Sequence, residues 1–552
     1  MLTKFFEDKI TCAVQKIYGL NENIIVSQPL SDLGDYTTNI CFKLVKQVGK
    51  KASEIADEII QNLQCDLEYN TYVQSTCEKN GHINIVLSND GIVHAMNSLI
   101  SENVHGMNEA MAGENICLEY VSANPTGPIS VVNGRAGVLG DVLSRIYKKC
   151  KAEVKRHYYV NDNPFSGQIT ALRDTFAYYE NVHNGNAIDF PEHGYKGEYV
   201  KKAWMSYHEK IEQLMCESDA FDETIHEIAW SQICDLQYLD IVYDYVDKES
   251  GLISAITIDM AFKFFDKDLS DFTYLKDGAT WLKTSEYGDD KDRVIIREDG
   301  RATYFNNDII YHACKAKCYS RLINILGADH HGYIARINAV MRMWEKPDVQ
   351  VILTQMVGLE TIDVDGKPIA YTGSKREGQY LLLKEDFVDK VGVDAARWYF
   401  LNGDPNTHLV INVDKASEQN MSNPVFYVQY AHARLCSLIK KSHNEGVMTG
   451  GDANFASLSS KDSVNLIKKL DDYQRIVITA GLKSNVQSLK TYLYELAQLV
   501  QKFYESERLI GKPINDWVAA LYLVEHSVKV LKNGLWLLGI SAPEEMKSLE
   551  IN

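Results

Sequence analysis

The chain of 552 residues lacks several features that mark special classes of protein. Its eleven cysteines are scattered singly and none belongs to a CxxC pair, so nothing supports a zinc ribbon or a thioredoxin-like redox site. We therefore expect reduced, mostly buried thiols and neither a bound metal nor an organic cofactor.

The sequence also has little that would direct it to a membrane. Residues 1–20 alternate charged and apolar residues at helical spacing and lack the apolar core of a signal peptide. No apolar run approaches the roughly 18 residues that a membrane span requires. We expect a cytoplasmic protein with no membrane partner.

Positive charge is in short supply, because 57 Lys and Arg stand against 75 Asp and Glu and give a net charge of −18. The whole molecule repels polyanions at long range, so a nucleic acid must be met by local basic patches. We expect no DNA partner. The hydrophobic content of 45% is that of an ordinary globular protein.

Hydrophobic periodicity divides the chain into an N-terminal, a central and a C-terminal part. Residues 1–110 have the pattern of an α+β domain, with a helix at 50–63 and a strand at 82–88. Residues 409–552 are helical in period and predict an all-α bundle.

Residues 111–408 alternate short apolar runs with helices, which is typical of βαβ units and predicts an α/β fold with a doubly wound, Rossmann-type parallel sheet. A helical, acidic insertion interrupts this pattern at about 165–270. The strands are expected at 115–123, 153–160, 292–299, 321–329 and 349–357.

A glycine-punctuated stretch, SANPTGPISVVNGRAGVLGD (122–141), leaves the first of these strands and enters a helix. Free backbone N–H groups and the helix dipole point to the same place at such a junction. The stretch is therefore a candidate phosphate-binding loop.

Many stretches, taken in order along nearly the whole chain, resemble the bacterial type of arginyl-tRNA synthetase, a class I aminoacyl-tRNA synthetase. The resemblance implies that the N-terminal domain contacts the tRNA elbow, that the sheet domain activates arginine with ATP and Mg²⁺, and that the bundle binds the anticodon. The matching text includes GDYTTNI (34–40), SANPTGPI (122–129), RHYYVND (156–162), YKGEYV (195–200), GADHHGY (327–333), VGVDAARWYFL (391–401) and NPVFYVQYAHARLCS (423–437).

The resemblance assigns the arginine pocket to Asn124, Tyr304 and Asp308, where Asn124 holds the backbone end of the amino acid. Tyr304 and Asp308, at i and i+4 of an expected helix, face one site, and a guanidinium needs a carboxylate and hydroxyl acceptors around it. The alternative is that Asp308 caps a helix or pairs with a surface lysine.

The first nucleotide signature departs from the family at several catalytic or ATP-binding positions. Ser130 and Asn133 stand where the family has histidines that donate to ATP phosphates, and they carry no positive charge. Val132 replaces the glycine against which adenine lies, so its side chain occupies ligand space. Gly134 is retained.

The second signature, GKPIAYTGSKREGQ (366–379), keeps Ser374 and Lys375 but has Thr372 where the first lysine is expected. The resemblance places Gly327, Asp329 and His330 beside the ribose and adenine of ATP. The alternative is that Asp329 caps the following helix. At the rim of the site, NDNPFSGQ (161–168) is longer than the family's loop.

The tRNA contacts implied by the resemblance are Asn39 and Asn84 near the elbow, and Tyr427, Tyr430 and Arg434 near the anticodon, where aromatic rings and cations suit unpaired bases. The alternative for the bundle residues is packing in a helical core. We expect partners of arginine and an arginine-accepting tRNA.

The resemblance implies ATP-dependent attachment of arginine to tRNA, with the usual ATP activation impaired by the altered signatures. One alternative is a non-enzymatic paralogue that binds tRNA or arginine as a sensor, regulator or partner subunit. Another is a repurposed ligase or transferase, for which the sequence names no substrate.

Overall fold

The computed structural model describes residues 2–29, 33–101, 106–213, 215–328, 332–363, 365–371 and 381–546. Contacts divide the chain into two compact units: unit 1 is Met1–Asn108 with Asn420–Leu537 and Ser541–Asn552, and unit 2 is Glu109–Gln419 with Leu538–Ile540. Within the described ranges, no helix has the length and apolar character needed to span a bilayer.

Unit 2 is built on a five-stranded parallel sheet with the order β11-β10-β4-β5-β6. This confirms the predicted α/β fold with a Rossmann-type sheet. The strands are β4 (Asn115–Tyr120), β5 (Glu153–Val160), β6 (Tyr245–Lys248), β10 (Arg321–Gly327) and β11 (Gln350–Thr354).

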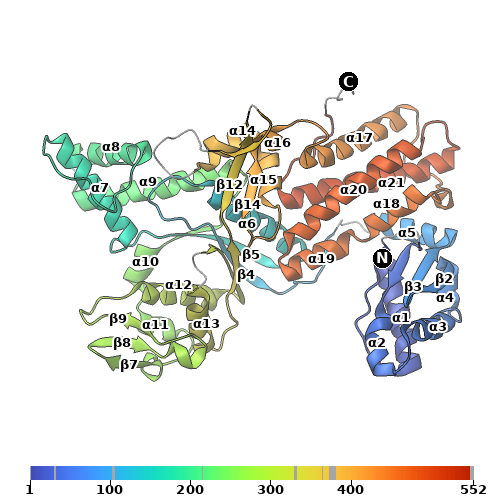
Figure 1. Cartoon of the computed structure of the whole chain (residues 1–552), viewed down its shortest axis with the longest axis horizontal. Helices are drawn as coiled ribbons and strands as arrows, with labels where there is room; N and C mark the ends of the chain where they lie inside the picture. The colour runs from blue at the N-terminus through green and yellow to red at the C-terminus, as the bar shows by residue number, and fades with distance from the viewer. Residues whose placement is uncertain are drawn as a thin grey trace. The chain divides into compact units, whose positions relative to one another are not determined.

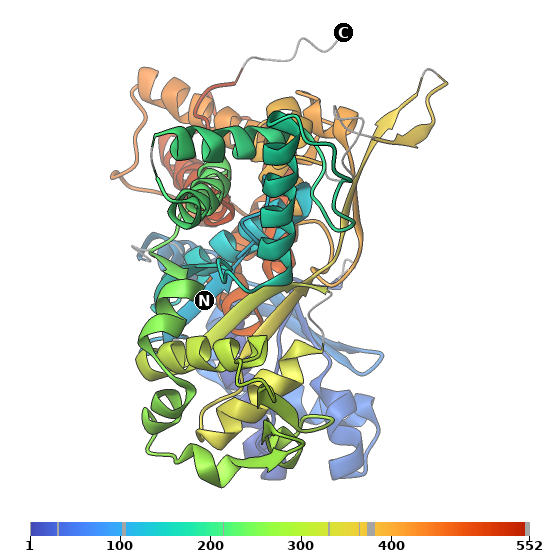
Figure 2. The ribbon, with the colours of Figure 1, turned by 90° about the vertical axis from the view of Figure 1, so that its left-hand side faces the viewer.

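Helices surround this sheet and include the predicted insertion between β5 and β6 (Figures 1 and 2). The insertion holds α7 (Gly167–His183), α8 (Glu198–Glu212) and α9 (Glu217–Gln237). The other helices of the unit are α6 (Val131–Lys149), α10 (Glu249–Ala255), α11 (Ile258–Lys263), α12 (Tyr304–Cys318), α13 (Tyr333–Met343), α14 (Asp389–Val391), α15 (Val393–Phe400) and α16 (Val413–Ser417).

One predicted strand belongs to a different sheet. The 292–299 segment forms β9 (Arg293–Ile296), which pairs antiparallel with β8 (Ala279–Leu282), and β7 (Thr273–Lys276) completes a separate three-stranded sheet. Its apolar run specifies a strand but not the partner of that strand. The prediction that it joins the parallel sheet is wrong.

Several strands were not predicted, and two of them lie where the sequence predicted helices. The edge strand β6 lies inside the range predicted as helical, because its four residues, YVDK, are mostly exposed and form no apolar run. Beyond 408 the chain first forms β14 (Leu409–Asn412), which pairs parallel with β12 (Val357–Ile362); β13 (Pro368–Ala370) completes their sheet. Figure 2 shows the β12–β13 hairpin extending away from the helices of unit 2.

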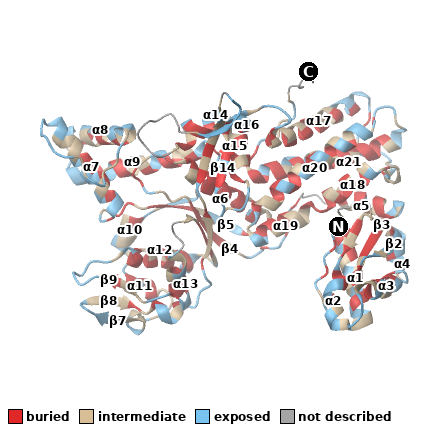
Figure 3. Cartoon of the chain, viewed as in Figure 1, coloured by how far each residue is buried: buried red, intermediate tan, exposed pale blue. Residues whose placement is uncertain are grey.

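Helix α6 is the central helix of unit 2 and is buried along most of its length (Figure 3). A Cβ at Gly140 would lie 2.3 Å from the ring of Tyr120 on β4, so only glycine allows this close approach of helix and sheet. At the next residue of α6, the Asp141 carboxylate lies 2.5 Å from Arg397 Nη2 of α15. This ion pair fastens α15 to the helix that begins at the candidate phosphate loop.

Unit 1 contains the N-terminal α+β domain and the helical bundle, as predicted. The domain carries an antiparallel sheet of order β1-β3-β2, and the predicted helix at 50–63 and strand at 82–88 are confirmed. Its elements are α1 (Leu2–Tyr18), β1 (Tyr36–Thr38), α2 (Ile40–Val48), α3 (Ala52–Leu63), α4 (Leu67–Tyr72), β2 (Val73–Lys79), β3 (His82–Leu87) and α5 (Asn89–Ser101). The bundle consists of α17 (Pro424–Asn444), α18 (Lys461–Asp471), α19 (Tyr473–Lys483), α20 (Val486–Ser506) and α21 (Ile514–Leu538).

Candidate active site

Polar side chains gather where β4 and β5 end, the edge at which open parallel sheets bind ligands. Val121 and Ser122, directly after β4, have φ of 71° and 41°, a left-handed conformation that non-glycine residues adopt at a cost. Ser122 Oγ donates to Glu119 Oε1 at 3.0 Å and accepts the N–H of Tyr159 at 3.1 Å. The two strand ends are therefore held together by hydrogen bonds.

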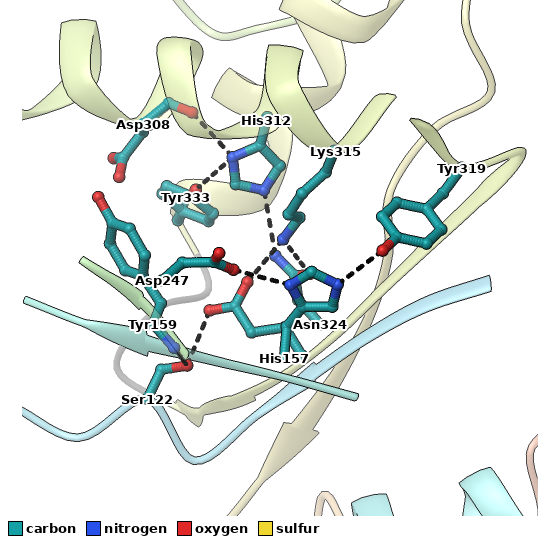
Figure 4. Close-up of polar contacts among 11 residues, drawn as sticks. Ser122, His157, Tyr159, Asp247, Asp308, His312, Lys315, Tyr319, Asn324 and Tyr333 are labelled. Carbon is teal, nitrogen blue, oxygen red and sulfur yellow. Dashed lines mark hydrogen bonds and ion pairs between the residues drawn. The ribbon is translucent and has the colours of Figure 1, made fainter. Parts of the chain in front are cut away.

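A buried charged network lies between β4, α12 and β10 (Figure 4). Lys315 Nζ donates to Glu119 Oε2 at 2.6 Å and to Asn324 Oδ1 at 3.1 Å. Burial and the nearby lysine lower the pKa of His312 to about 3, so its imidazole is neutral. His312 Nδ1 donates to the Asp308 carbonyl at 2.8 Å, and Nε2 accepts from Asn324 at 3.1 Å.

The Asp308 carboxylate lies at the open end of this network. Among the described residues it has no hydrogen-bond or ion-pair partner, and Figure 4 shows the Tyr159 hydroxyl pointing toward it. Burial, Glu249 and Glu119 raise the pKa of Asp308 to about 8, against the opposing effect of Lys315 and Arg336. The surroundings thus disfavour the ionised form of Asp308, and a cation placed beside this carboxyl would favour it.

The predicted helix that carries Tyr304 and Asp308 is α12, and Tyr304 lies in its first turn. The Tyr304 hydroxyl is already engaged by the loop after β5: it accepts the N–H of Gly167 at 2.8 Å and donates to the carbonyl of Phe165 at 3.3 Å. Asn124 is exposed, and its carbonyl accepts from Gln232 at 2.9 Å. Asp308 caps no helix, and no lysine forms an ion pair with it among the described residues.

Ser130 and Asn133, the predicted catalytic positions of the first signature, form the N-terminal cap of α6. Ser130 Oγ donates to Asn133 Oδ1 at 2.7 Å, and the Ser130 N–H donates to the same oxygen at 3.1 Å. The Asn133 N–H returns a bond to Ser130 Oγ at 3.5 Å. The two side chains therefore satisfy each other in a capping box.

The two predicted ATP-binding residues beside this cap, Val132 and Gly134, lie in the first turn of α6. Val132 is half-buried in the first turn of α6. Gly134 is buried, and a Cβ there would lie 2.4 Å from Leu383 Cδ1 and 3.0 Å from the ring of Phe400. Its lack of a side chain serves packing within the unit.

The segments flanking the two signatures are paired with each other. The Val131 N–H donates to the Leu381 carbonyl at 2.9 Å, and the Leu383 N–H donates to the Ile129 carbonyl at 3.0 Å. Gly327 is the last residue of β10 and pairs with Thr354. The other predicted residues here, Thr372, Ser374, Lys375, Asp329 and His330, lie outside the described residues.

Three buried charged residues of the site, Glu119, Lys315 and Glu249, were not predicted. Glu249 accepts from Asn163 at 2.9 Å and from Asn307 at 2.8 Å. A sequence signal existed for Glu119, because a charged residue inside the apolar strand NICLEY is rarely buried without a partner. Nothing local indicated that the partner is Lys315.

The two asparagines predicted to contact tRNA differ in accessibility. Asn39 is exposed at the start of α2 and makes no side-chain capping bond. Asn84 lies on the central strand β3 and is 1% exposed. In this conformation the Asn84 side chain offers no surface to a ligand.

Tyr427, Tyr430 and Arg434 lie at helical spacing on α17 and are half-buried. The Arg434 guanidinium carbon is 3.8 Å from the ring centroid of Tyr504, and Nη1 donates to Gln501 at 3.0 Å. The neighbouring helix α20 therefore holds the guanidinium close to an aromatic ring.

The fold and the site together define a class I aminoacyl-tRNA synthetase architecture, and family comparisons agree. A family model described as "tRNA synthetases class I (R), catalytic domain" matches residues 95–431, "Arginyl tRNA synthetase N terminal domain" matches 4–87, and "DALR anticodon binding domain" matches 428–546.

The chain belongs to the arginyl-tRNA synthetase family. It is 34% identical to an arginine–tRNA ligase of Nitratiruptor sp. over 95% of this chain and 98% of that protein, and 32% identical to one of Aquifex aeolicus over 99% and 100%. Solved arginyl-tRNA synthetases of similar fold include those of Thermus thermophilus (TM-score 0.75, 20% identity, 99% and 100% covered) and Plasmodium falciparum (TM-score 0.71, 16% identity, 99% and 99% covered). The family implies the use of ATP with Mg²⁺, arginine and tRNA.

Proposed function

We propose that this member of the family binds arginine and an arginine-accepting tRNA, and that its ATP-dependent activation of arginine is impaired. Asp308 binds the guanidinium, Tyr304 borders it, and Asn124 holds the backbone end of the amino acid. The N-terminal domain, residues 1–110, contacts the tRNA elbow, the bundle, residues 409–552, binds the anticodon, and the catalytic domain is residues 111–408.

The environment of the Asp308 carboxyl supports arginine binding most directly. Burial, Glu249 and Glu119 raise the pKa of this carboxyl to about 8. A permanent cation placed beside it would stabilise its ionised form strongly. A guanidinium stays charged at every relevant pH and offers several donors in a plane. Lysine, with a compact charge, fits such a planar arrangement less well.

The Ser130–Asn133 pair supports impaired activation. The phosphate-binding role needs cationic donors aimed at developing charge, whereas these neutral side chains are bonded to each other at 2.7 Å. Val132 adds a branched side chain where adenine would approach the backbone. Mg²⁺ is usually bound together with nucleotide phosphates.

A non-enzymatic role is the second candidate, and the same capping box favours it. Loss of nucleotide contacts with retention of the arginine pocket and the bundle's aromatic surface would leave a protein that senses or carries arginine and tRNA. The two candidates differ in whether any arginyl adenylate forms.

Calorimetric titration of arginine tests the pocket. The wild type should bind arginine, whereas citrulline, a neutral isostere of arginine, should not bind measurably. The Asp308→Asn variant should bind arginine at least tenfold more weakly, because a charge-assisted pair is lost. Asp299→Asn is the matched control, since Asp299 is an exposed partner of Arg301. Equal affinities of the wild type and Asp308→Asn would contradict this pocket.

A further inference from the structure

Within unit 1, a buried ion pair joins the N-terminal domain to the helical bundle. Lys468 on α18 is 4% exposed, and its Nζ lies 3.0 Å from Asp35 Oδ1. Asp35 directly precedes β1 and belongs to the N-terminal domain. The pair therefore connects residues of two domains that lie 433 positions apart in the sequence.

Both ends of this ion pair are anchored. Asp35 Oδ2 accepts the N–H of Leu87 at 2.9 Å, and the Asp35 N–H donates to the Ile85 carbonyl at 2.7 Å, so the carboxylate is fixed to the sheet. Lys468 lies on α18, which packs against α5 of the N-terminal domain and α20 of the bundle (Figure 1). The geometry of the pair therefore sets how the domain is oriented on the bundle.

Around the first turn of α1, the polar contacts of the same junction are long. The Thr3 N–H lies 3.4 Å from Asp471 Oδ2, and the Thr3 hydroxyl lies 3.4 Å from Asp472 Oδ1. Gln28 Nε2 lies 3.4 Å from Asp472 Oδ2. Hydrogen bonds of this length are weak, so these contacts hold the domain less firmly than the ion pair does.

A buried hydroxyl at the junction is not hydrogen-bonded. Tyr36 is 1% exposed, and its hydroxyl has no hydrogen-bond partner among the described residues. Burial, Asp471 and Asp472 raise the pKa of this phenol, which places it near the carboxylates of the junction. An unpaired buried hydroxyl costs free energy that contact with water would recover. The surroundings of the ion pair thus favour opening of the junction.

We propose that the ion pair between Lys468 and Asp35 is a latch, which holds the N-terminal domain on the bundle in an orientation that lets both parts contact one tRNA at once. The inference rests on the proposed function, which assigns the tRNA elbow and the anticodon to these two parts. Two contacts to one ligand reinforce each other when their spacing is preset, because the second contact then forms at a high effective concentration. Breaking the latch leaves each contact intact and lowers that effective concentration.

The test compares an arginine-accepting tRNA with the isolated anticodon stem–loop of the same tRNA, each bound to the full chain. Lys468→Met should weaken binding of the tRNA about tenfold and change the affinity for the stem–loop less than twofold. Lys469→Met is the matched control, because Lys469 is the next residue of α18 and pairs with Glu495 of α20, inside the bundle. This control should bind both RNAs as the wild type does.

A second variant tests whether the pair itself is responsible. Asp35→Asn keeps an oxygen that can accept the N–H of Leu87 but removes the negative charge, and it should weaken tRNA binding as Lys468→Met does. The double variant should lose no more affinity than Lys468→Met alone, because both changes remove the same contact. Losses that multiply to about a hundredfold would overturn the latch.

Hydrogen exchange measures the opening without tRNA. In Lys468→Met, the amides of residues 2–6 and 35–38 should exchange faster than in the wild type, whereas those of α3, in the same domain, should be unchanged. Unchanged exchange at residues 2–6 and 35–38 would overturn the latch. Faster exchange throughout α3 would also overturn it, because the domain would then unfold instead of separating from the bundle.

The outcomes separate this inference from the proposed function. If the wild type binds the tRNA and the stem–loop, and Lys468→Met weakens both equally or neither, the latch alone is overturned. If the wild type binds neither RNA, the assignment of tRNA as a ligand is itself contradicted.

Discussion

The Ser130 hydroxyl donates to Asn133 Oδ1 at 2.7 Å at the start of α6. The two residues that we expect at the histidine positions of the family's first signature are therefore partners of each other. A capping box of this kind stabilises a helix by about 1 kcal/mol. In the function proposed above, side chains that would bind phosphate in the family contribute here to local stability instead.

Restoring the signature should restore nucleotide binding. Combined Ser130→His, Val132→Gly, Asn133→His and Thr372→Lys replaces the neutral donors by cationic ones and removes the side chain at the adenine position. We expect measurable ATP binding by calorimetry where the wild type shows little. The variant should also unfold about 1 kcal/mol more easily, since the capping box is lost. A variant that still binds no ATP would place the obstruction elsewhere, for example in the longer loop at 161–168.

Arginine binding should depend on pH through Asp308. The pKa of this carboxyl is about 8 in the free protein, so it is protonated at pH 6.5, whereas its guanidinium-bound form is ionised. Binding should release close to one proton at pH 6.5, and the dissociation constant should fall about tenfold per pH unit up to pH 8 and then level off. Calorimetry in buffers of different ionisation enthalpy measures the released proton, and Asp308→Asn should release none.

The same shift affects stability in the absence of arginine. A carboxyl with a raised pKa binds more protons in the folded state than in the unfolded state, so its contribution to stability falls as pH rises from about 4 to about 8. Saturating arginine should abolish this decrease in stability between about pH 4 and pH 8. An unfolding midpoint whose response to pH is identical with and without arginine would contradict the assigned pKa.

Arg434 should contribute to tRNA binding as a planar cation. Its guanidinium lies 3.8 Å from the centroid of the Tyr504 ring, an arrangement that Lys does not reproduce. Arg434→Ala should weaken tRNA binding about tenfold. Arg434→Lys should restore only the salt-dependent share of the lost affinity, because Lys keeps the charge but not the planar group. Filter binding at two salt concentrations separates these contributions. Full rescue by Lys would show that charge alone matters.

The buried ion pair between Asp141 and Arg397 should be critical for folding of unit 2. The side chains are 1% and 0% exposed, respectively, and lie 2.5 Å apart. Arg397→Met leaves a buried carboxylate with less compensation and should lower the free energy of unfolding by about 3 to 5 kcal/mol. Arg301→Met, which breaks an exposed pair with Asp299, should change it by less than about 1 kcal/mol. Denaturant titration compares the two, and similar losses would contradict this account.

The fold could be predicted where local patterns determine it. The apolar strands β4 and β10 and the helix α6 follow from periodicity, but β6 is a short, exposed edge strand whose residues lack an apolar pattern. The sheet to which β9 belongs depends on pairing with β8, which its own residues do not encode.

The site, like the fold, could be predicted only where the residues involved are close together in the sequence. Spacing placed Tyr304 and Asp308 on one helix, whereas the pairing of Glu119 with Lys315 joins residues 196 positions apart. Likewise, the Tyr304 hydroxyl bonds to a loop that lies 137 positions earlier, at Gly167. Such contacts arise from tertiary packing and leave no local signal.

Arginine-dependent exchange of pyrophosphate into ATP, with and without tRNA, tests the central claim most directly. With arginine binding verified by calorimetry in the same preparation, we predict exchange at least a hundredfold slower than that of an arginine–tRNA ligase with intact histidines, consistent with the loss of transition-state contacts. Exchange at the rate of such an enzyme would contradict the account.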